Sequence, residues 1–194
     1  MTKLFDGSPV GAAFRIAGGS IHVASVLRLL TVHLILKGTN MARIHFYGKP
    51  DCINNRKQKE LLTAAGHELI DHDLLQEEFT TESLRVFFED RPVADWFNPT
   101  APAITSGNVH PEQLDEHEAL ALMLDDHLLV RRPLIRIDTL SFCGFDTDRL
   151  KQLIDFKPVA GNKNLFDQLI DADLVTCPRI GESNCTTAEG MNNG

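Results

Sequence analysis

Cysteine is scarce in this sequence. Only four cysteines occur in 194 residues, and no two of them form a CxxC pair. A set this sparse and irregular excludes the disulfide framework of a small secreted protein. We therefore expect reduced thiols in a cytoplasmic protein. The four are Cys52, Cys143, Cys177 and Cys185.

Positive charge and long apolar runs are also in short supply. The chain has 19 basic and 27 acidic side chains and a formal net charge of -8, and such a charge repels phosphate backbones. The most apolar stretch, residues 21–36, is interrupted by His22, Arg28 and His33, and a charge at the centre of a membrane span costs about 3 kcal/mol. We expect neither nucleic-acid binding nor a membrane span.

Several catalytic and cofactor motifs are missing. The sequence has no glycine-rich phosphate loop, no Gly-x-Ser-x-Gly elbow and no His-Glu-x-x-His pattern. Its histidines lie among acidic residues without helical ligand spacing, so we expect no metal site and no bound cofactor.

Composition divides the chain into three parts. Residues 1–40 are poor in acids, and Met41 then precedes a regular pattern of strands and helices. We expect residues 1–40 to be an upstream extension or a start-site artefact, with the folded domain over 41–157. Residues 158–194 form a C-terminal tail that is predicted to carry one short helix, over 164–174.

The domain begins with a strand, a helix and a second strand. Alternating β-rich residues over 43–47 predict a strand, a turn follows at Gly48 to Pro50, and residues 52–65 read as a helix. Gly66 ends that helix, and a further strand is predicted over 67–73. This βαβ unit implies two parallel strands.

A helical insert and a terminal ββα unit complete the domain. Thr80 or Thr81 is predicted to cap a helix that carries Leu84, Phe87 and Phe88. Two later helices are predicted, one opened by Pro111 and one over 118–127, followed by a hairpin over 133–145. Asp146 or Thr147 then caps the last helix. The order βαβ, helical insert, ββα predicts an α/β thioredoxin-like fold with a mixed sheet.

Cys52 is the candidate nucleophile. It stands at the predicted start of a helix, where unpaired N–H groups and the positive end of the helix dipole favour a thiolate. Arg56 lies four residues on, on the same helix face, and Lys49 adds charge in the preceding turn. The alternative is an inert buried cysteine, the commoner state of this residue type. The polar neighbours of Cys52 favour exposure and function.

Two sequence blocks resemble the arsenate reductase and Spx family. Tyr47 to Arg56 matches its Tyr-x-x-Pro-x-Cys-x-x-x-Arg opening, and residues 129–135 with the later Gly-Phe-Asp resemble its second block. The resemblance implies that Arg132 and a cis Pro133 face Cys52. The start at Met41 and the tail past residue 158 are similar to the nitrogenase-associated branch of this family.

The sequence departs from the family at several positions. Gly48 and Ile53 replace a histidine and a glycine of the arsenate reductases, and their two further anion-site arginines align near Asn98 and within residues 143–145. Each charge-assisted hydrogen bond lost costs about 1.5 to 3 kcal/mol. Asn55 takes the second position of the Spx CxxC switch. Efficient arsenate reduction and an internal redox switch are therefore not expected.

Two hypotheses for function follow. The first is a thiol-dependent oxidoreductase in which Cys52 attacks, Arg56 and Arg132 stabilise negative charge, and glutathione is the external reductant. The second is a non-catalytic module that binds a partner in nitrogen-fixation metabolism. Glutaredoxin or a nitrogen-fixation protein is the expected partner of a monomer, and Lys49 and Pro133 are supporting site residues.

Overall fold

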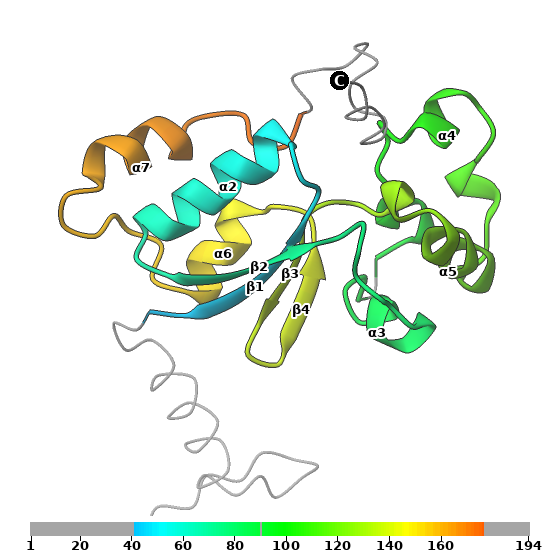
Figure 1. Ribbon diagram of the computed structural model, residues 1–194, viewed down its shortest axis with the longest axis horizontal. Helices are drawn as coiled ribbons and strands as arrows, with labels where there is room; N and C mark the ends of the chain where they lie inside the picture. The colour runs from blue at the N-terminus through cyan, green and yellow to red at the C-terminus, as the bar shows by residue number, and fades with distance from the viewer. Residues whose placement is uncertain (1–40, 90, 177–194) are drawn as a thin grey trace, which may run out of the picture. The chain divides into compact units, whose positions relative to one another are not determined.

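The computed structural model describes residues 41–89 and 91–176. The proposed upstream extension and the tail cysteines Cys177 and Cys185 lie outside the described residues. Figure 1 shows the arrangement of the described elements, coloured along the chain.

A four-stranded mixed sheet forms the centre of the fold. Its order is β2-β1-β3-β4, and β1 pairs in parallel with β2 and antiparallel with β3, which pairs antiparallel with β4. The predicted thioredoxin-like architecture with a mixed sheet is confirmed. The strands are β1 (Arg43–Gly48), β2 (Glu68–Asp73), β3 (Leu134–Ile137) and β4 (Leu140–Cys143).

Three helices share one core with the sheet. Residues two apart in a strand face the same side, so Ile44 and Phe46 of β1 point into a cluster with Leu61 and Leu62 of α2. Helices α2 and α7 lie side by side (Figure 1), and Leu150 of α6 belongs to the same cluster. The three helices are α2 (Ile53–Ala64), α6 (Thr147–Leu153) and α7 (Lys163–Ile170).

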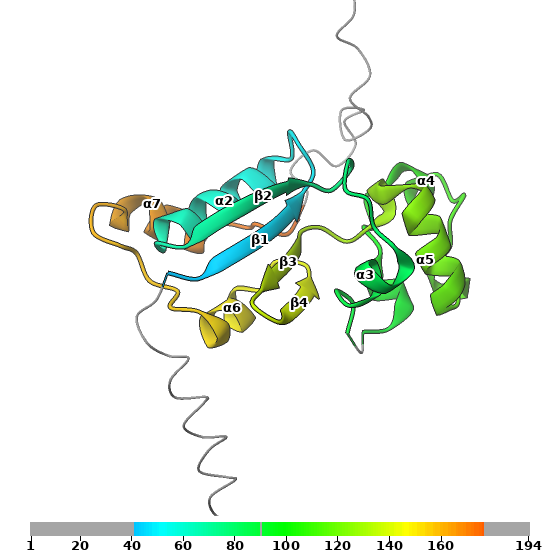
Figure 2. The same ribbon diagram turned by 60° about the horizontal axis from the view of Figure 1, so that its bottom comes forward.

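The insert between β2 and β3 builds a second core. Tyr47, Leu134 and Cys143, from the opposite face of the sheet, join buried insert residues such as Phe88 and Trp96. In both views the insert helices gather beyond one end of the strands (Figures 1 and 2). They are α3 (Thr81–Arg85), α4 (Pro102–Thr105) and α5 (Glu116–Asp125), with 3₁₀ turns over Val93–Trp96, Pro111–Gln113 and His127–Leu129.

Two predicted helices of the insert are wrong in extent. Thr80 does cap α3 through a capping box, but the helix ends at Arg85. Phe87 and Phe88 therefore lie beyond it, although both are fully buried; Glu89 takes a left-handed conformation with φ +52°, which a continuing helix does not allow. Pro111 opens only a 3₁₀ turn, because the chain is extended at Leu114 before Asp115 caps α5.

Candidate functional site

The turn that carries Cys52 follows directly from β1. Asp51 has a left-handed conformation, φ +61°, and the Cys52 N–H donates to the Lys49 carbonyl at 3.3 Å. Cys52 is then the N-cap residue of α2, and its carbonyl accepts from the Arg56 N–H at 3.0 Å. Its side chain makes no capping hydrogen bond, and the residue is half-buried. Cys52 is thus partly accessible beside the first-turn N–H groups of α2.

The strand register brings Arg132 and Pro133 to the Cys52 end of the sheet. Tyr47 of β1 pairs with Leu134 of β3, so the chain after Tyr47 and the chain before Leu134 leave the sheet at the same end. The expected cis peptide bond between Arg132 and Pro133 is present. Pro133 is buried and Arg132 half-buried.

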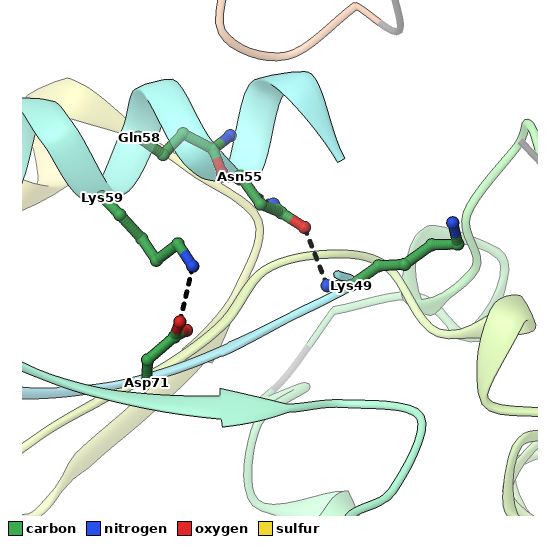
Figure 3. A network of polar contacts seen from close by, with 5 residues as sticks. All are labelled: Lys49, Asn55, Gln58, Lys59 and Asp71. Atoms are coloured by element: carbon green, nitrogen blue, oxygen red, sulfur yellow. Dashed lines mark hydrogen bonds and ion pairs between the residues drawn. The ribbon is translucent and has the colours of Figure 1, made fainter. Parts of the chain in front are cut away.

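The two charged neighbours of Cys52 are placed differently. Arg56 lies one turn along α2 and is exposed to solvent. The Lys49 side chain points away from Asn55 and α2 (Figure 3), while its backbone N–H is tied to the helix. Arg56 shares the helix turn with Cys52 as predicted, whereas Lys49 contributes to the site through its backbone.

A chain of amide groups runs from the Cys52 turn to Leu174, near the end of the described chain, and Figure 3 shows its members Lys49, Asn55 and Gln58. The Lys49 N–H donates to Asn55 Oδ1 at 3.0 Å, and Asn55 Nδ2 donates to Gln58 Oε1 at 2.8 Å. Gln58 Nε2 in turn donates to the Leu174 carbonyl at 2.7 Å. Asn55 and Gln58 are both buried. We call this series, from Lys49 through Asn55 and Gln58 to Leu174, the amide relay.

The relay explains why Gly48 has no side chain. A Cβ at this position would lie 2.9 Å from the ring of Phe46 and 3.2 Å from Asn55 Oδ1. The first distance is shorter than Cβ contacts in folded proteins and the second is tight, so a side chain at residue 48 would require Phe46 and Asn55 to shift. The histidine that the arsenate reductases carry here does not fit while Asn55 holds its present position.

A cavity of about 300 Å³ opens beside this end of the sheet. Since Leu134 pairs with Cys143 of β4, Arg132 and Gly144 leave the sheet together, and both line the cavity. Arg91 comes from the insert and Arg131 precedes Arg132, so three guanidinium side chains face one space. Gln58 of the amide relay forms part of the wall.

Cys143 lies in the wall of this cavity but is not poised to react. It is 1% exposed, and burial raises the pKa of its thiol, an effect that Arg91 and Arg131 only partly offset. Cys143 is thus a buried core residue at the end of β4.

Asn98 occupies a structural position. Its Nδ2 donates to the Leu128 carbonyl at 3.2 Å, and its Oδ1 accepts from the Thr100 hydroxyl at 2.9 Å. The residue is buried. The side chain thus ties two loops of the insert together, and its polar groups are already used.

The sequence reasoning missed Gln58, Arg91 and Arg131 as neighbours of Arg132. Arg131 could have been found from the sequence, since it directly precedes Arg132. No sequence pattern indicated Arg91, because only the fold of the insert brings residue 91 beside residue 131. Among residues 41–89 and 91–176, no cluster of three or more metal-ligating side chains occurs, and no helix has the length and apolar character to cross a membrane.

Known proteins share both the sequence and the fold. Residues 47–153 match the model of the ArsC family. A protein of Rhodospirillum rubrum, described as an uncharacterized 15.7 kDa protein in the draG 3′ region, is 53% identical over 106 residues, which are 55% of this chain and 74% of the relative.

Two solved structures share the fold at low sequence identity. An arsenate reductase from Vibrio cholerae is 18% identical with a TM-score of 0.51, covering 59% of this chain and 99% of its own. An ArsC family related protein from Bacteroides fragilis is 23% identical with a TM-score of 0.51, covering 57% and 98%. The family match spans the Cys52 helix, the insert and the ββα unit, and the chain belongs to the ArsC family.

Proposed function

We propose that this chain is a thiol-dependent redox protein whose nucleophile is Cys52 and whose external reductant is glutathione, alone or through glutaredoxin. The observation that carries the proposal is the position of Cys52. It is half-buried at the N-cap of a 12-residue helix, its side chain takes no part in capping, and the first turn of that helix has no acidic residue. Helix N-termini of this kind favour the thiolate, the nucleophilic form of cysteine.

The chemistry is a pair of thiol–disulfide exchanges. The Cys52 thiolate attacks the glutathione sulfur of a glutathionylated substrate; the substrate leaves as a thiolate, and a disulfide forms between Cys52 and glutathione. A second glutathione thiolate attacks that disulfide, which releases oxidised glutathione and restores the Cys52 thiolate. Each cycle consumes one reduced glutathione: the substrate thiol is restored, and the glutathionyl group taken from the substrate leaves in oxidised glutathione. This cycle requires a reducing glutathione pool, so we place the protein in the cytoplasm.

The two predicted arginines have separate roles in this proposal. Arg56 adds positive charge one helical turn from Cys52, where a surface charge pair contributes about 1 kcal/mol or less. Arg132, at the same end of the sheet as the Cys52 turn, faces the carboxylates of a bound glutathione moiety. A guanidinium binds a carboxylate through two parallel hydrogen bonds.

Arsenate is not the substrate we propose. Gly48 is closely packed, Asn98 is used by the insert, and residues 143–145 carry no basic side chain. The biological setting we propose is nitrogen fixation, because the relative from Rhodospirillum rubrum is described by its place in the draG region, a context of nitrogenase regulation.

A non-catalytic partner-binding role is the second candidate. The observation that favours it is the structural use of Asn98, since the arginine expected there in an arsenate reductase is replaced by a residue that only braces the insert. In this role the protein docks to a nitrogen-fixation protein, and Cys52 takes no part in a catalytic cycle.

The experiment is a coupled deglutathionylation assay. The full chain is incubated with a glutathionylated peptide, glutathione, glutathione reductase and NADPH, with and without glutaredoxin. We expect Cys52→Ser to abolish turnover, Cys143→Ser to retain it, and Arg56→Met to lower it several-fold. The matched control for Arg56→Met is Arg43→Met, which removes another exposed arginine, in β1. Absence of turnover in the wild type, or its survival in Cys52→Ser, would favour the binding role.

A further inference from the structure

The described side chains that line the arginine-lined cavity carry more positive than negative charge. Of the side chains that line it, Arg91, Arg131 and Arg132 are cationic, and Asp146 is the one acidic residue. This concentration occurs in a chain whose net charge is -8. The three arginines are half-buried, and guanidinium groups gathered in partial burial are unfavourable unless anions accompany them.

Two acidic groups nearby have other hydrogen-bond partners, although the charge of Glu89 also interacts with that of Arg91. Glu89 binds Arg149 through two hydrogen bonds of 2.5 and 2.6 Å. Asp146 caps α6, where its Oδ1 accepts from the Asp148 and Arg149 N–H groups at 3.0 Å each. Burial raises the pKa of Cys143, so this thiol stays neutral and does not act as a counter-ion.

Arg91 and Arg131 retain donor capacity. The buried Nε–H of Arg91 has no hydrogen-bond partner in the described part of the chain, and a buried donor of this kind ordinarily binds water or a ligand. Arg131 Nη1 donates to the Asp95 carbonyl at 3.2 Å, and a guanidinium has four further N–H groups. Neither side chain forms an ion pair with a described carboxylate.

The backbone keeps room for these side chains. Gly144 has φ +81°, and a Cβ there would lie 3.4 Å from the Nε of Arg131. Glycine is favoured at such a conformation, and here it also avoids crowding the guanidinium. Val175, which is 67% exposed, closes another part of the wall.

We propose that this cavity binds a small dianion, either a phosphate monoester or a dicarboxylate, through Arg91 and Arg131 together with Arg132. Guanidinium groups bind phosphate and carboxylate oxygens in pairs. A single carboxylate offers two oxygens, whereas a phosphate or a pair of carboxylates offers enough acceptors for several arginines. A volume of about 300 Å³ is at the small end of the range for ligand pockets.

The site does not depend on the proposed redox role of Cys52. Cys52 is not among the residues that line the cavity. Arg132 has a part in both proposals, whereas Arg91 and Arg131 have none in the proposed redox chemistry, so the test uses variants of these two. Binding of the dianion and turnover at Cys52 can therefore be measured separately.

Calorimetric titration of the full chain provides the test. The probes are inorganic phosphate, glycerol 3-phosphate and succinate, with acetate as the monoanion control at constant ionic strength. We expect at least one dianion to bind saturably and at least tenfold more tightly than acetate. Arg91→Met and Arg131→Met should each weaken its binding by roughly tenfold or more, while Arg91→Lys and Arg131→Lys should each retain part of the affinity.

The controls separate this proposal from misfolding and from the redox function. Arg43→Met removes an exposed arginine far from the cavity lining and should bind as the wild type does; Cys52→Ser should do the same. Thermal melts without anion check that each variant folds, and Arg131→Met alone decides the outcome if Arg91→Met does not fold. The proposal is wrong if no dianion binds more tightly than acetate, or if the folded methionine variants bind it unchanged.

Discussion

Asn54 donates a hydrogen bond of 2.8 Å from its side-chain amide to the carbonyl oxygen of Thr176, 122 residues later in the chain. Gln58, one helical turn further on, holds Leu174 in the same way at 2.7 Å. The first turns of α2, the helix that begins at Cys52, thus fix the last described residues. Residues 173–176 are therefore bound to the candidate site by two side-chain amides.

Replacing Asn54 should loosen this segment. Asn54→Ala removes the hydrogen bond to Thr176, and we expect the free energy of unfolding to fall by about 1 kcal/mol. Backbone hydrogen exchange at residues 173–176 should accelerate, because the remaining contact through Gln58 no longer holds both ends. Asn108→Ala, at an exposed position, is the control and should leave exchange unchanged. Equal exchange in the two variants would contradict the expectation.

The thiols at 52 and 143 should differ greatly in reactivity. Cys52 is half-buried beside a helix N-terminus, whereas Cys143 is 1% exposed with its pKa raised by burial. We expect iodoacetamide to label Cys52 in the native protein at least roughly a hundredfold faster than Cys143, whose labelling requires opening of the core. Peptide mass mapping after timed quenching measures both rates. In urea, where the core is open, the two thiols should be labelled at similar rates. Comparable labelling rates in the native protein would contradict the expectation.

Two glycines of similar conformation should respond differently to alanine. Gly66 has φ +85° and a Cβ there would lie 2.3 Å from Val159 Cγ1, while Gly107 has φ +76° and open space. Both substitutions carry a backbone strain of about 1–2 kcal/mol. Gly66→Ala should cost about 1–3 kcal/mol more, because Val159 must move. Urea unfolding of the two variants measures the difference in their free energies of unfolding. A difference near zero would show that Val159 moves aside without cost and would contradict the expectation.

Stability should fall in mild acid because of His67. The Ala42 N–H donates to His67 Nδ1 at 3.2 Å, and Nε2–H donates to the Asp155 carbonyl at 3.1 Å, which describes a neutral imidazole. Burial lowers the His67 pKa, and the Asp155 carbonyl and charge only partly oppose it. The unfolded chain, with a histidine pKa near 6.5, then takes up the proton first as pH falls. The contribution of His67 is therefore constant above about pH 6.5 and becomes destabilising below it.

The His67 effect is measurable as a difference between variants. We expect the free energy of unfolding of His67→Gln to fall less steeply than that of the wild type between about pH 6.5 and pH 5. His117→Gln, at an exposed position, should keep the wild-type slope. An unchanged slope in His67→Gln would show that other groups cause the acid sensitivity.

Much of the fold could be predicted from local sequence signals. The alternation over 43–47, Gly66 after the first helix and the capping residues Thr80 and Asp146 each act within a few residues, and the corresponding elements are present. The end of α3 was not predicted, because Phe87 and Phe88 have helical spacing but are buried by tertiary packing in the turn that follows. Helical spacing of apolar residues indicates which residues are buried, and here the buried residues continue past the end of the helix.

The site was predictable only where its residues are close in sequence. Cys52 and Arg56 share a helix turn, and Arg132 and Pro133 form a dipeptide that can be recognised in the sequence. Arg91 reaches the cavity through the path of the insert, which no local pattern specifies. Gln58 could be placed on α2, yet its bond to Leu174 joins residues 116 apart.

The amide relay contains no titratable group. The relay consists of side-chain amides and backbone groups, none of which gains or loses a proton in ordinary buffers. The turn that presents Cys52 is therefore held by the same bonds in acid and in alkali. A change of buffer pH should accordingly leave the hydrogen bonds from Lys49 through Asn55 and Gln58 to Leu174 intact.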